Sequence, residues 1–453
     1  MKTVNPTTGE LIKEYAEMSP DEVNGIIDRA NIAQLQWAQK SFEQRAACLQ
    51  RVASLLKERK ESLGQLMSQE MGKPIAQSIS EVEKCAWVCE YYAENAASFL
   101  ADRMVETDAS KSYVAFKPLG IILSIMPWNF PFWQLFRFAV PALMAGNGIV
   151  LKHSENTSGC ALEIETLIHD SGCSRDLFRT ILVSNEHMKP IIQHSGIAAV
   201  TLTGSTKAGK IVASQAGEAL KKTVLELGGN DPYIILKDAN IKQAAITCVT
   251  SRLINSGQSC VAAKRFIVVE EVYEAFVYEF TALMKEKVMG DPFEELTDIG
   301  PLARVDLRDS IHKQVQESVK KGAKITLGGT IPDRKGAFYP VTILENVQKG
   351  MPAYHEELFG PVASIIKVKN EEEAIEVAND SIYGLGAAIF SENVEHVESI
   401  VAERLHAGCC FVNELVKSDP RLPFGGIKHS GYGRELGLFG IHEFVNTKTI
   451  YIS

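Results

Sequence analysis

The feature that most constrains the fold is a change of hydrophobic period near residue 113. Before it, apolar residues recur at helical spacing over Pro20–Gln39 and again from Ser41, a plausible N-cap, to a break near Gly72. After it, short β-branched runs alternate with helical stretches. Strands separated by helices pair in parallel through right-handed crossovers. The sequence therefore predicts an α/β fold with doubly wound sheets, which bind ligands at the carboxyl ends of their strands.

The alternation occurs in two series. In the first, strands are expected at Ile121–Met126, Gly148–Lys152, Thr180–Val183 and Ala198–Thr203, with helices at Ser158–Ser171 and Thr206–Leu220. In the second, strands are expected at Tyr233–Leu236, Arg265–Val269, Val362–Val368, Gly386–Phe390 and Cys409–Val412. Its helices are expected at Ile241–Ser256, Tyr273–Glu286, Leu307–Lys321, Glu371–Asn379 and Val394–Leu405. The repeat predicts a second α/β domain.

One strand-like segment, Thr447–Ile452, ends the chain without an obvious local partner. An unpaired terminal strand can extend the sheet of another subunit, so this segment suggests an oligomer.

Composition narrows the class of protein. A chain of 453 residues is too long for a single hydrophobic core of ordinary size. Its 45% hydrophobic and 23% charged residues are typical of a globular protein. A net charge of −9, without a basic block, disfavours nucleic acid and anionic membranes as partners. We see no secretory signal and no membrane span. The nine cysteines are odd in number and irregular in spacing, which predicts reduced thiols in a cytoplasmic protein and no metal site.

Three segments could carry chemistry. Thr203–Gly209 is expected to lie between a strand and a helix, where backbone N–H groups can hold a phosphate. The alternative is a glycine-rich turn that only caps the helix, which has the same sequence pattern. Glu226 precedes two glycines, so its carboxylate either faces a cleft or lies in a solvated turn. Cys260 ends the turn after a helix and is either a nucleophile, with a lowered thiol pKa, or an inert packing residue.

Ordered motifs along nearly the whole chain resemble the NAD(P)-dependent aldehyde dehydrogenase superfamily, most closely its short bacterial succinate-semialdehyde dehydrogenases. The motifs are Asn5–Glu10, Pro127–Pro131, Leu151–Glu155, Glu226–Gly229, Gly257–Cys260, Glu357–Val362 and Pro423–Glu435.

The resemblance implies a domain organisation. An NAD-binding domain would span 1–100 and 119–228, and a catalytic domain would span 229–430. Residues 101–118 and 431–453 would form a small β oligomerisation segment, giving a homodimer or a homotetramer.

The resemblance also implies catalytic roles. Cys260 would attack the aldehyde carbon to give a thiohemiacetal and then a thioester. The side chain of Asn129 and the backbone N–H of Cys260 would stabilise the oxyanion. Glu226 would be the general base that activates the hydrolytic water.

The implied cofactor-binding residues are Trp128, Lys152, Glu155, Gly204, Ser205, Leu227, Glu357 and Phe359. Glu155 lies at a position that binds the adenosine ribose. Its carboxylate would accept hydrogen bonds from ribose hydroxyls but repel a 2′-phosphate, which favours NAD over NADP.

The implied substrate pocket contains Trp133, Arg137, Ser418 and, as a weaker second cation, Arg252. Arginine in a pocket suits a substrate carboxylate, and serine at the position of Ser418 is typical of succinate-semialdehyde dehydrogenases. Succinate semialdehyde is therefore the expected substrate. The alternative for Arg137 is a structural ion pair with a nearby acid. One departure is Ile254, where the well-known branch has an arginine.

Other functions remain as alternatives. The enzyme could oxidise glutarate semialdehyde or an uncharged aliphatic aldehyde. A CoA-acylating dehydrogenase is disfavoured because Glu226 positions a base for hydrolysis. A catalytically silent protein is disfavoured because packing alone would not need Cys260, Glu226 and Asn129 together.

Overall fold

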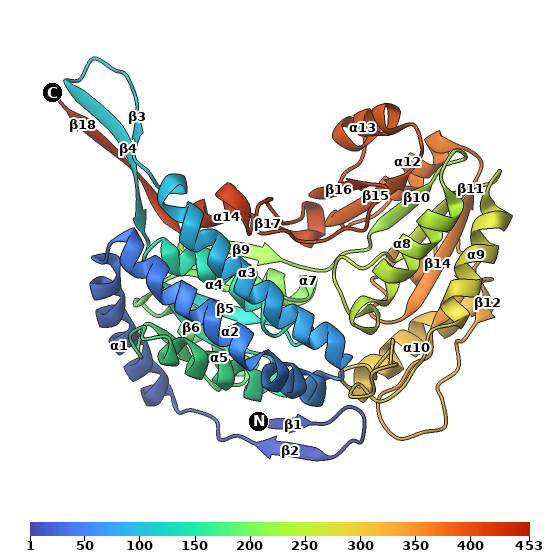
Figure 1. The fold of residues 1–453 in the computed structure, drawn as a ribbon, viewed down its shortest axis with the longest axis horizontal. Helices are drawn as coiled ribbons and strands as arrows, with labels where there is room; N and C mark the ends of the chain where they lie inside the picture. The colour runs from blue at the N-terminus through green and yellow to red at the C-terminus, as the bar shows by residue number, and fades with distance from the viewer.

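A computed structural model describes residues 1–453. It consists of two α/β bodies, a projecting β arm and an N-terminal hairpin (Figure 1). The first sheet has the strand order β17-β9-β8-β5-β6-β7. Its strands are β5 (Ile121–Met126), β6 (Gly148–His153), β7 (Phe178–Thr180), β8 (Ile197–Thr203), β9 (Lys222–Glu226) and β17 (Gly431–Tyr432).

Helices cover both faces of this first sheet. They are α1 (Pro20–Ala38), α2 (Phe42–Met71), α3 (Ile75–Phe99), α4 (Trp133–Met144), α5 (Ser158–Asp170), α6 (Met188–Gln193), α7 (Thr206–Glu218) and α14 (Gly437–His442). One hydrophobic core joins the sheet to α2, α3, α4 and α5, and another joins it to α1, α6 and α7.

The second sheet has the order β12-β13-β14-β11-β10-β15-β16. Its strands are β10 (Pro232–Ile235), β11 (Arg265–Val269), β12 (Lys324–Leu327), β13 (Thr342–Glu345), β14 (Val362–Val368), β15 (Gly386–Phe390) and β16 (Cys409–Val412). Its helices are α8 (Ile241–Leu253), α9 (Tyr273–Lys285), α10 (Val305–Lys320), α11 (Pro352–His355), α12 (Glu371–Asn379) and α13 (Val394–Glu403). Helices α8 and α9 pack on one face, and the remaining helices pack on the other.

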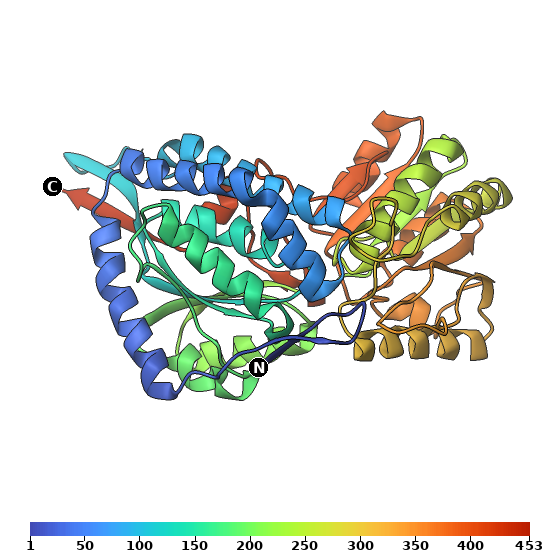
Figure 2. The ribbon, with the colours of Figure 1, turned by 60° about the horizontal axis from the view of Figure 1, so that its bottom comes forward.

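The two long helices α2 and α3 form an antiparallel pair along the first body (Figure 2). Helix α2 begins with a capping box between Ser41 and Gln44 and ends at Gly72, as its sequence predicts. Gly72 has φ +80, and a Cβ there would lie 2.7 Å from Pro301 of the second body. Glycine is therefore required both for the left-handed cap and for the contact between the bodies.

The N-terminal hairpin, β1 (Lys2–Val4) with β2 (Leu11–Glu14), also joins the two bodies, because the backbone N–H of Ala337 donates to the carbonyl of Pro6 at 2.8 Å. The sequence patterns did not predict this hairpin.

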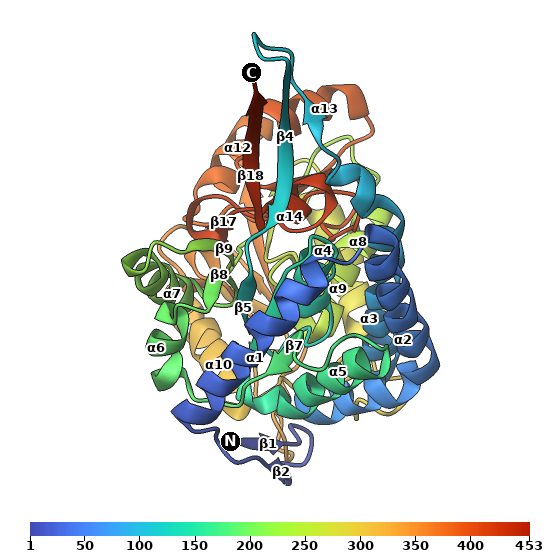
Figure 3. The ribbon, with the colours of Figure 1, turned by 90° about the vertical axis from the view of Figure 1, so that its left-hand side faces the viewer.

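The expectation of an unpaired terminal strand is wrong. Strand β18 (Val445–Ile452) pairs antiparallel with β4 (Lys111–Pro118), which also pairs with β3 (Arg103–Met104). These three strands form the arm that projects from the first body (Figure 3). The two segments expected to form it, 101–118 and the C-terminal strand, thus do lie together.

Two other expectations need correction. The expected oligomerisation segment includes residues 431–442, but β17 adds to the first sheet beside β9 and α14 packs on α3 and α4. The strand expected at Thr180–Val183 is β7 at Phe178–Thr180. Each sheet also has an antiparallel edge strand, β17 or β12, in addition to its parallel strands. No helix is both long and apolar enough to cross a membrane.

Candidate active site

The loop that carries Cys260 is held in an unusual backbone conformation. Helix α8 ends at Leu253, and Asn255 and Ser256 follow with φ of 52° and 54°. Non-glycine residues rarely adopt such angles, so tertiary contacts must hold them. The Asn255 side chain supplies two, donating to the carbonyls of Asn129 (2.6 Å) and Gln258 (3.1 Å). The expected helix Ile241–Ser256 is therefore shorter, because this turn redirects the chain toward the first body.

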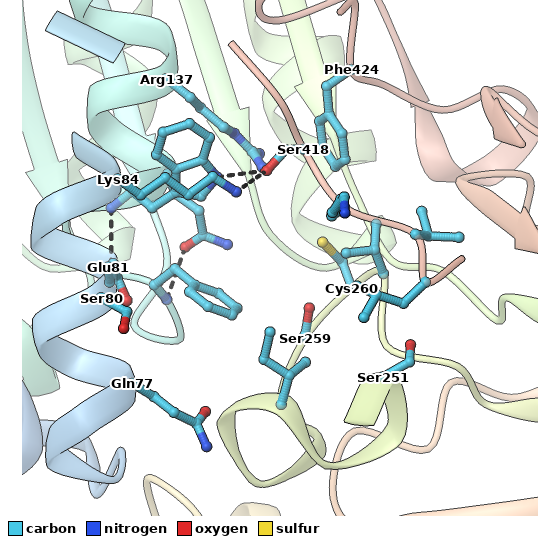
Figure 4. Close-up of a pocket in the computed structure, with 18 of the residues that line it drawn as sticks. Gln77, Ser80, Glu81, Lys84, Arg137, Ser251, Ser259, Cys260, Ser418 and Phe424 are labelled. Atoms are coloured by element: carbon cyan, nitrogen blue, oxygen red, sulfur yellow. Dashed lines mark hydrogen bonds between the residues drawn. The ribbon is translucent and has the colours of Figure 1, made fainter. Parts of the chain in front are cut away.

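Cys260 faces a cavity of about 330 Å³ between the bodies (Figure 4). Helix α3 forms one wall with Gln77, Ser80, Glu81 and Lys84, and the Cys260 loop forms another. The lining also includes Phe130, Trp133, Gln134, Arg137, Ser251, Ile254, Ser259, Val261, Phe424 and the segment 415–418. The cavity is thus apolar around the thiol and carries positive charge at Lys84 and Arg137.

The Cys260 thiol is neutral in this conformation. Burial raises its pKa to about 12, although the positive charges of Arg137 and Lys264 act to lower it. Because the thiolate is the nucleophile, the site needs a further stabilising influence, or a base, to activate it.

Asn129 is buried next to the Cys260 loop. Its Nδ2 donates to the carbonyl of Gln258 at 3.0 Å, and its Oδ1 accepts from Nε2 of Gln134 at 3.0 Å. These bonds fix the amide plane and leave one Nδ2 hydrogen free. The geometry is suited to an oxyanion donor whose direction is set before substrate binds.

Glu226 is the last residue of β9 and does not line the cavity that holds Cys260. Its side chain is buried, and neither carboxylate oxygen has a hydrogen-bond partner. Burial and the neighbouring Glu435 raise its pKa well above the usual range, while Arg137 and Arg434 act to lower it. Burial therefore favours the neutral form of Glu226, and its enclosed oxygens have no hydrogen-bond partner in the protein.

Most of the expected cofactor residues lie at the carboxyl ends of β5, β6, β8 and β9, as a doubly wound sheet predicts, whereas Glu357 and Phe359 lie between α11 and β14 of the second body. Ser205 caps α7 by accepting from the Ala208 backbone N–H at 3.2 Å. Lys152 Nζ donates to Asn185 Oδ1 at 2.6 Å, and Glu155 begins a short helical turn. The rings of Trp128 and Phe359 pack edge to face, with their centres 5.8 Å apart. Leu227 packs closely on α7, because a Cβ at Gly209 would lie 2.6 Å from its side chain.

These residues fit a dinucleotide. The N-terminus of α7 presents free backbone N–H groups beside Gly204, where a pyrophosphate can be held. A Cβ at Gly228 would lie 2.5 Å from Glu357 Oε2, so glycine there keeps room for that carboxylate. Glu357 accepts from the Gly229 backbone N–H at 3.0 Å and is thereby oriented.

Lys264 joins the nucleophile loop to this carboxylate. Its fully buried Nζ donates to the carbonyls of Ser259 (2.8 Å) and Cys260 (2.5 Å) and lies 3.5 Å from Glu357. Sequence reasoning missed this residue. Its signal is a lysine four positions after the candidate nucleophile, immediately before the apolar run that forms β11.

The structure divides the four expected substrate residues. Trp133 and Ser418 line the cavity, and the indole N–H of Trp133 donates to Ser418 Oγ at 2.9 Å. Arg137 also lines it, but its guanidinium forms a buried ion pair with Glu435 and donates to Thr203 Oγ1 at 3.2 Å. The structural ion pair, the alternative for Arg137, is thus present.

Arg252 does not reach the cavity. Its fully buried guanidinium donates to the carbonyl of Gly257 at 2.6 Å, on the far side of the Cys260 turn. The expectation of a second substrate cation at Arg252 is therefore corrected, because α8 directs this side chain into the turn.

The chain is similar to known proteins along nearly its whole length. The model of the Aldehyde dehydrogenase family matches residues 1–450. The chain belongs to the aldehyde dehydrogenase family. It is accordingly an NAD(P)-dependent aldehyde dehydrogenase with the family's α/β fold.

Relatives of this aldehyde dehydrogenase carry more specific names. A probable succinate-semialdehyde dehydrogenase [NADP(+)] from Synechocystis is 47% identical, covering 100% of this chain and 99% of the relative. Succinate semialdehyde dehydrogenase [NAD(P)+] Sad from Escherichia coli is 42% identical, covering 99% and 97%. A crystal structure of succinic semialdehyde dehydrogenase from Streptococcus pyogenes with NADP+ has a TM-score of 0.97 and 38% identity, covering 100% and 99%.

Proposed function

We propose that this aldehyde dehydrogenase oxidises succinate semialdehyde to succinate with NAD. The observation that carries the proposal is the cavity, which holds a cysteine thiol and, within the same enclosed space, the cations Lys84 and Arg137 with the hydroxyl of Ser418. An uncharged aldehyde would leave the Lys84 ammonium without an anionic partner, because Arg137 already pairs with Glu435 but Lys84 forms no ion pair, and this disfavours binding of an uncharged aldehyde. The names of the relatives support the same substrate.

The reaction begins when the Cys260 thiol loses its proton to solvent and the resulting thiolate attacks the aldehyde carbon. A C–S bond forms, and the carbonyl electrons move to oxygen, giving a thiohemiacetal oxyanion. The free Nδ2 hydrogen of Asn129 and the backbone N–H of Cys260 are the donors for that oxygen. Removal of one such donor costs about 3–4 kcal/mol of transition-state stabilisation in comparable sites.

When bound, the nicotinamide supplies the acceptor for the hydride that leaves the thiohemiacetal carbon. Glu357, held by Lys264 and by the Gly229 N–H, would bind the adjoining ribose. The aromatic edge formed by Trp128 and Phe359 would exclude water from that end of the site. The product left on the enzyme is a succinyl thioester of Cys260.

Hydrolysis releases the product. Glu226, once it has lost its proton, takes a proton from water, and the hydroxide attacks the thioester carbon. The C–S bond breaks, and the departing Cys260 thiolate takes the proton that Glu226 removed from water, which restores the thiol. The new carboxyl group loses its proton to solvent, and succinate leaves. The buried carboxylate with unpartnered oxygens supports hydrolysis rather than transfer to CoA.

The preference for NAD rests on Glu155. No basic side chain forms an ion pair with its carboxylate, although Lys152 is close enough for Glu155 to act to raise the lysine pKa. A 2′-phosphate would therefore meet an unneutralised negative charge. In this respect the chain would differ from the relatives whose names specify NADP(+).

Steady-state kinetics test the proposal. Succinate semialdehyde, glutarate semialdehyde, butanal and propanal are each assayed with NAD and with NADP by reduced-cofactor absorbance. We expect the highest kcat/KM for succinate semialdehyde with NAD. A higher kcat/KM for the uncharged aldehydes would overturn the substrate, and a higher value with NADP would overturn the cofactor preference.

A further inference from the structure

Lys84 is a half-buried cation in the substrate cavity, and it forms no ion pair with a carboxylate. It lies on α3 and lines the cavity, opposite the Cys260 loop (Figure 4). Its Nζ donates to Ser418 Oγ at 3.0 Å and lies 4.2 Å from the centre of a Trp133 ring. It forms no ion pair in the structure, although it faces an enclosed cavity in which an ammonium without an anion is poorly solvated.

The acids nearest to Lys84 are engaged elsewhere. Glu81 forms a buried ion pair with Lys73 and accepts from the backbone N–H groups of Phe132 and Trp133, both at 2.9 Å. Asp419 pairs with Arg421 at 2.7 Å. The Lys84 ammonium thus keeps donors that no protein acceptor uses, beside an open cavity.

Arg137 differs from Lys84 in this respect. Its charge is already paired with the Glu435 carboxylate, and its Nη2 already donates to Thr203. A substrate carboxylate at Arg137 would compete with Glu435, but at Lys84 it would compete with nothing.

We propose that Lys84 is the residue that binds the substrate carboxylate, acting with Ser418. The serine oxygen already accepts from Lys84 and from Trp133, so its own hydroxyl hydrogen is free to donate into the cavity. The ammonium and the hydroxyl then bind one carboxylate together. This inference rests on the proposed function and names the group that selects a carboxylated aldehyde.

Binding should depend on the protonation of Lys84. Burial, with the positive charge of Arg137 on α4, lowers its pKa to about 8, while Glu81 and Cys85 on α3 and Asp419 after β16 act to raise it. The lysine is charged below that pH and loses its proton above it. The KM for succinate semialdehyde should therefore rise above pH 8, while the KM for butanal should not follow it.

The test compares Lys84→Met with the unmodified enzyme on succinate semialdehyde and on butanal. Loss of a charge-assisted contact should raise the KM for the semialdehyde by about 10- to 100-fold. The kcat/KM for butanal should stay within about twofold, and Lys84→Arg should restore part of the semialdehyde KM. The matched control is Lys60→Met, which removes a lysine from the neighbouring helix α2. It should leave the KM for both substrates unchanged.

Two failures can be distinguished. If the unmodified enzyme does not prefer succinate semialdehyde, the proposed function is wrong. If it does, and Lys84→Met keeps the same KM for it, the role of Lys84 is wrong. Should Lys84→Met not fold, the pH profile of the unmodified enzyme decides, because a semialdehyde KM that stays flat across pH 8 contradicts the role.

Discussion

Cys260 and Glu226 share one physical property at the scale of single residues, because burial holds each in its uncharged form. The thiol has a pKa of about 12, and the Glu226 pKa is raised well above its usual range by burial and by Glu435. Each must lose a proton to act, the first as a nucleophile and the second as a base. The resting site is therefore protected from unwanted reactions of a free thiolate.

The state of Cys260 predicts how its reactivity depends on pH. Without cofactor, the rate of iodoacetamide addition to Cys260 should rise about tenfold per pH unit from pH 7 to 10, because the thiolate fraction grows that way below the pKa. Peptide mass spectrometry separates Cys260 from the other cysteines. A rate that levels off near pH 8 would contradict a thiol held neutral by burial.

The residues of the site were predictable to different degrees. Cys260, Glu226 and Asn129 lie in family motifs that identify their positions in the sequence. The structure places Asn129 against the Cys260 loop. Lys84 and Lys264 lie in no such motif, and their roles arise only when α3 and β11 meet the Cys260 loop. Arg137 was found from its helix spacing, but Glu435, its partner, is almost 300 residues away in sequence.

At the scale of elements, a buried contact between Glu81 and the start of α4 holds α3, which forms one wall of the cavity, against α4. Glu81 of α3 accepts from two backbone N–H groups at the start of α4, and Lys73 neutralises it. The residues just before α4 provide no side-chain cap for this helix. Glu81 of α3 takes that place, because its carboxylate accepts from the free N–H groups at the start of α4.

Loss of that neutralising charge should destabilise the protein. Lys73→Met leaves Glu81 buried without its cation, and we expect the free energy of unfolding to fall by about 3–5 kcal/mol. The matched control is Lys60→Met, which breaks the partly exposed pair with Glu83 and should cost less than about 1 kcal/mol. Urea denaturation followed by circular dichroism measures both, and equal changes would refute the role given to Lys73.

Most elements could be predicted, and several of those that could not share one cause. Strands such as Arg265–Val269 and Gly386–Phe390 have the predicted bounds, because buried parallel strands are continuous apolar runs. The hairpin β1–β2, the edge strand β12 and the two-residue β17 are short and partly exposed, so their sequences lack that signal. The turn after α8 depends on Asn255 contacts made across the molecule.

At the scale of the whole molecule, the arm formed by β3, β4 and β18 projects from the first body, and neither body covers it. Strand β18 is an edge strand and most of its side chains are exposed, including Tyr451 and Ile452. An exposed edge can pair with another chain, and we propose that the arm joins copies of this enzyme into a homodimer or a homotetramer.

Light scattering coupled to size exclusion tests the assembly. The full chain should elute with the mass of a dimer or a tetramer, and a chain ending at Val445 should elute as a smaller species with a retained circular dichroism spectrum. An unchanged mass after removal of β18 would show that the arm does not hold the copies together.

The central claim is that succinate semialdehyde becomes a succinyl thioester on Cys260 and that Glu226 directs its hydrolysis. Glu226→Gln keeps the shape of the buried side chain but removes the base, so the thioester should accumulate. The most direct measurement is the mass of the Cys260 peptide after this variant is mixed with NAD and succinate semialdehyde and quenched in acid. The account predicts the added mass of one succinyl group on Cys260 and none in the unmodified enzyme at completion. Reduced cofactor formed without that adduct, or the adduct on another residue, would contradict it.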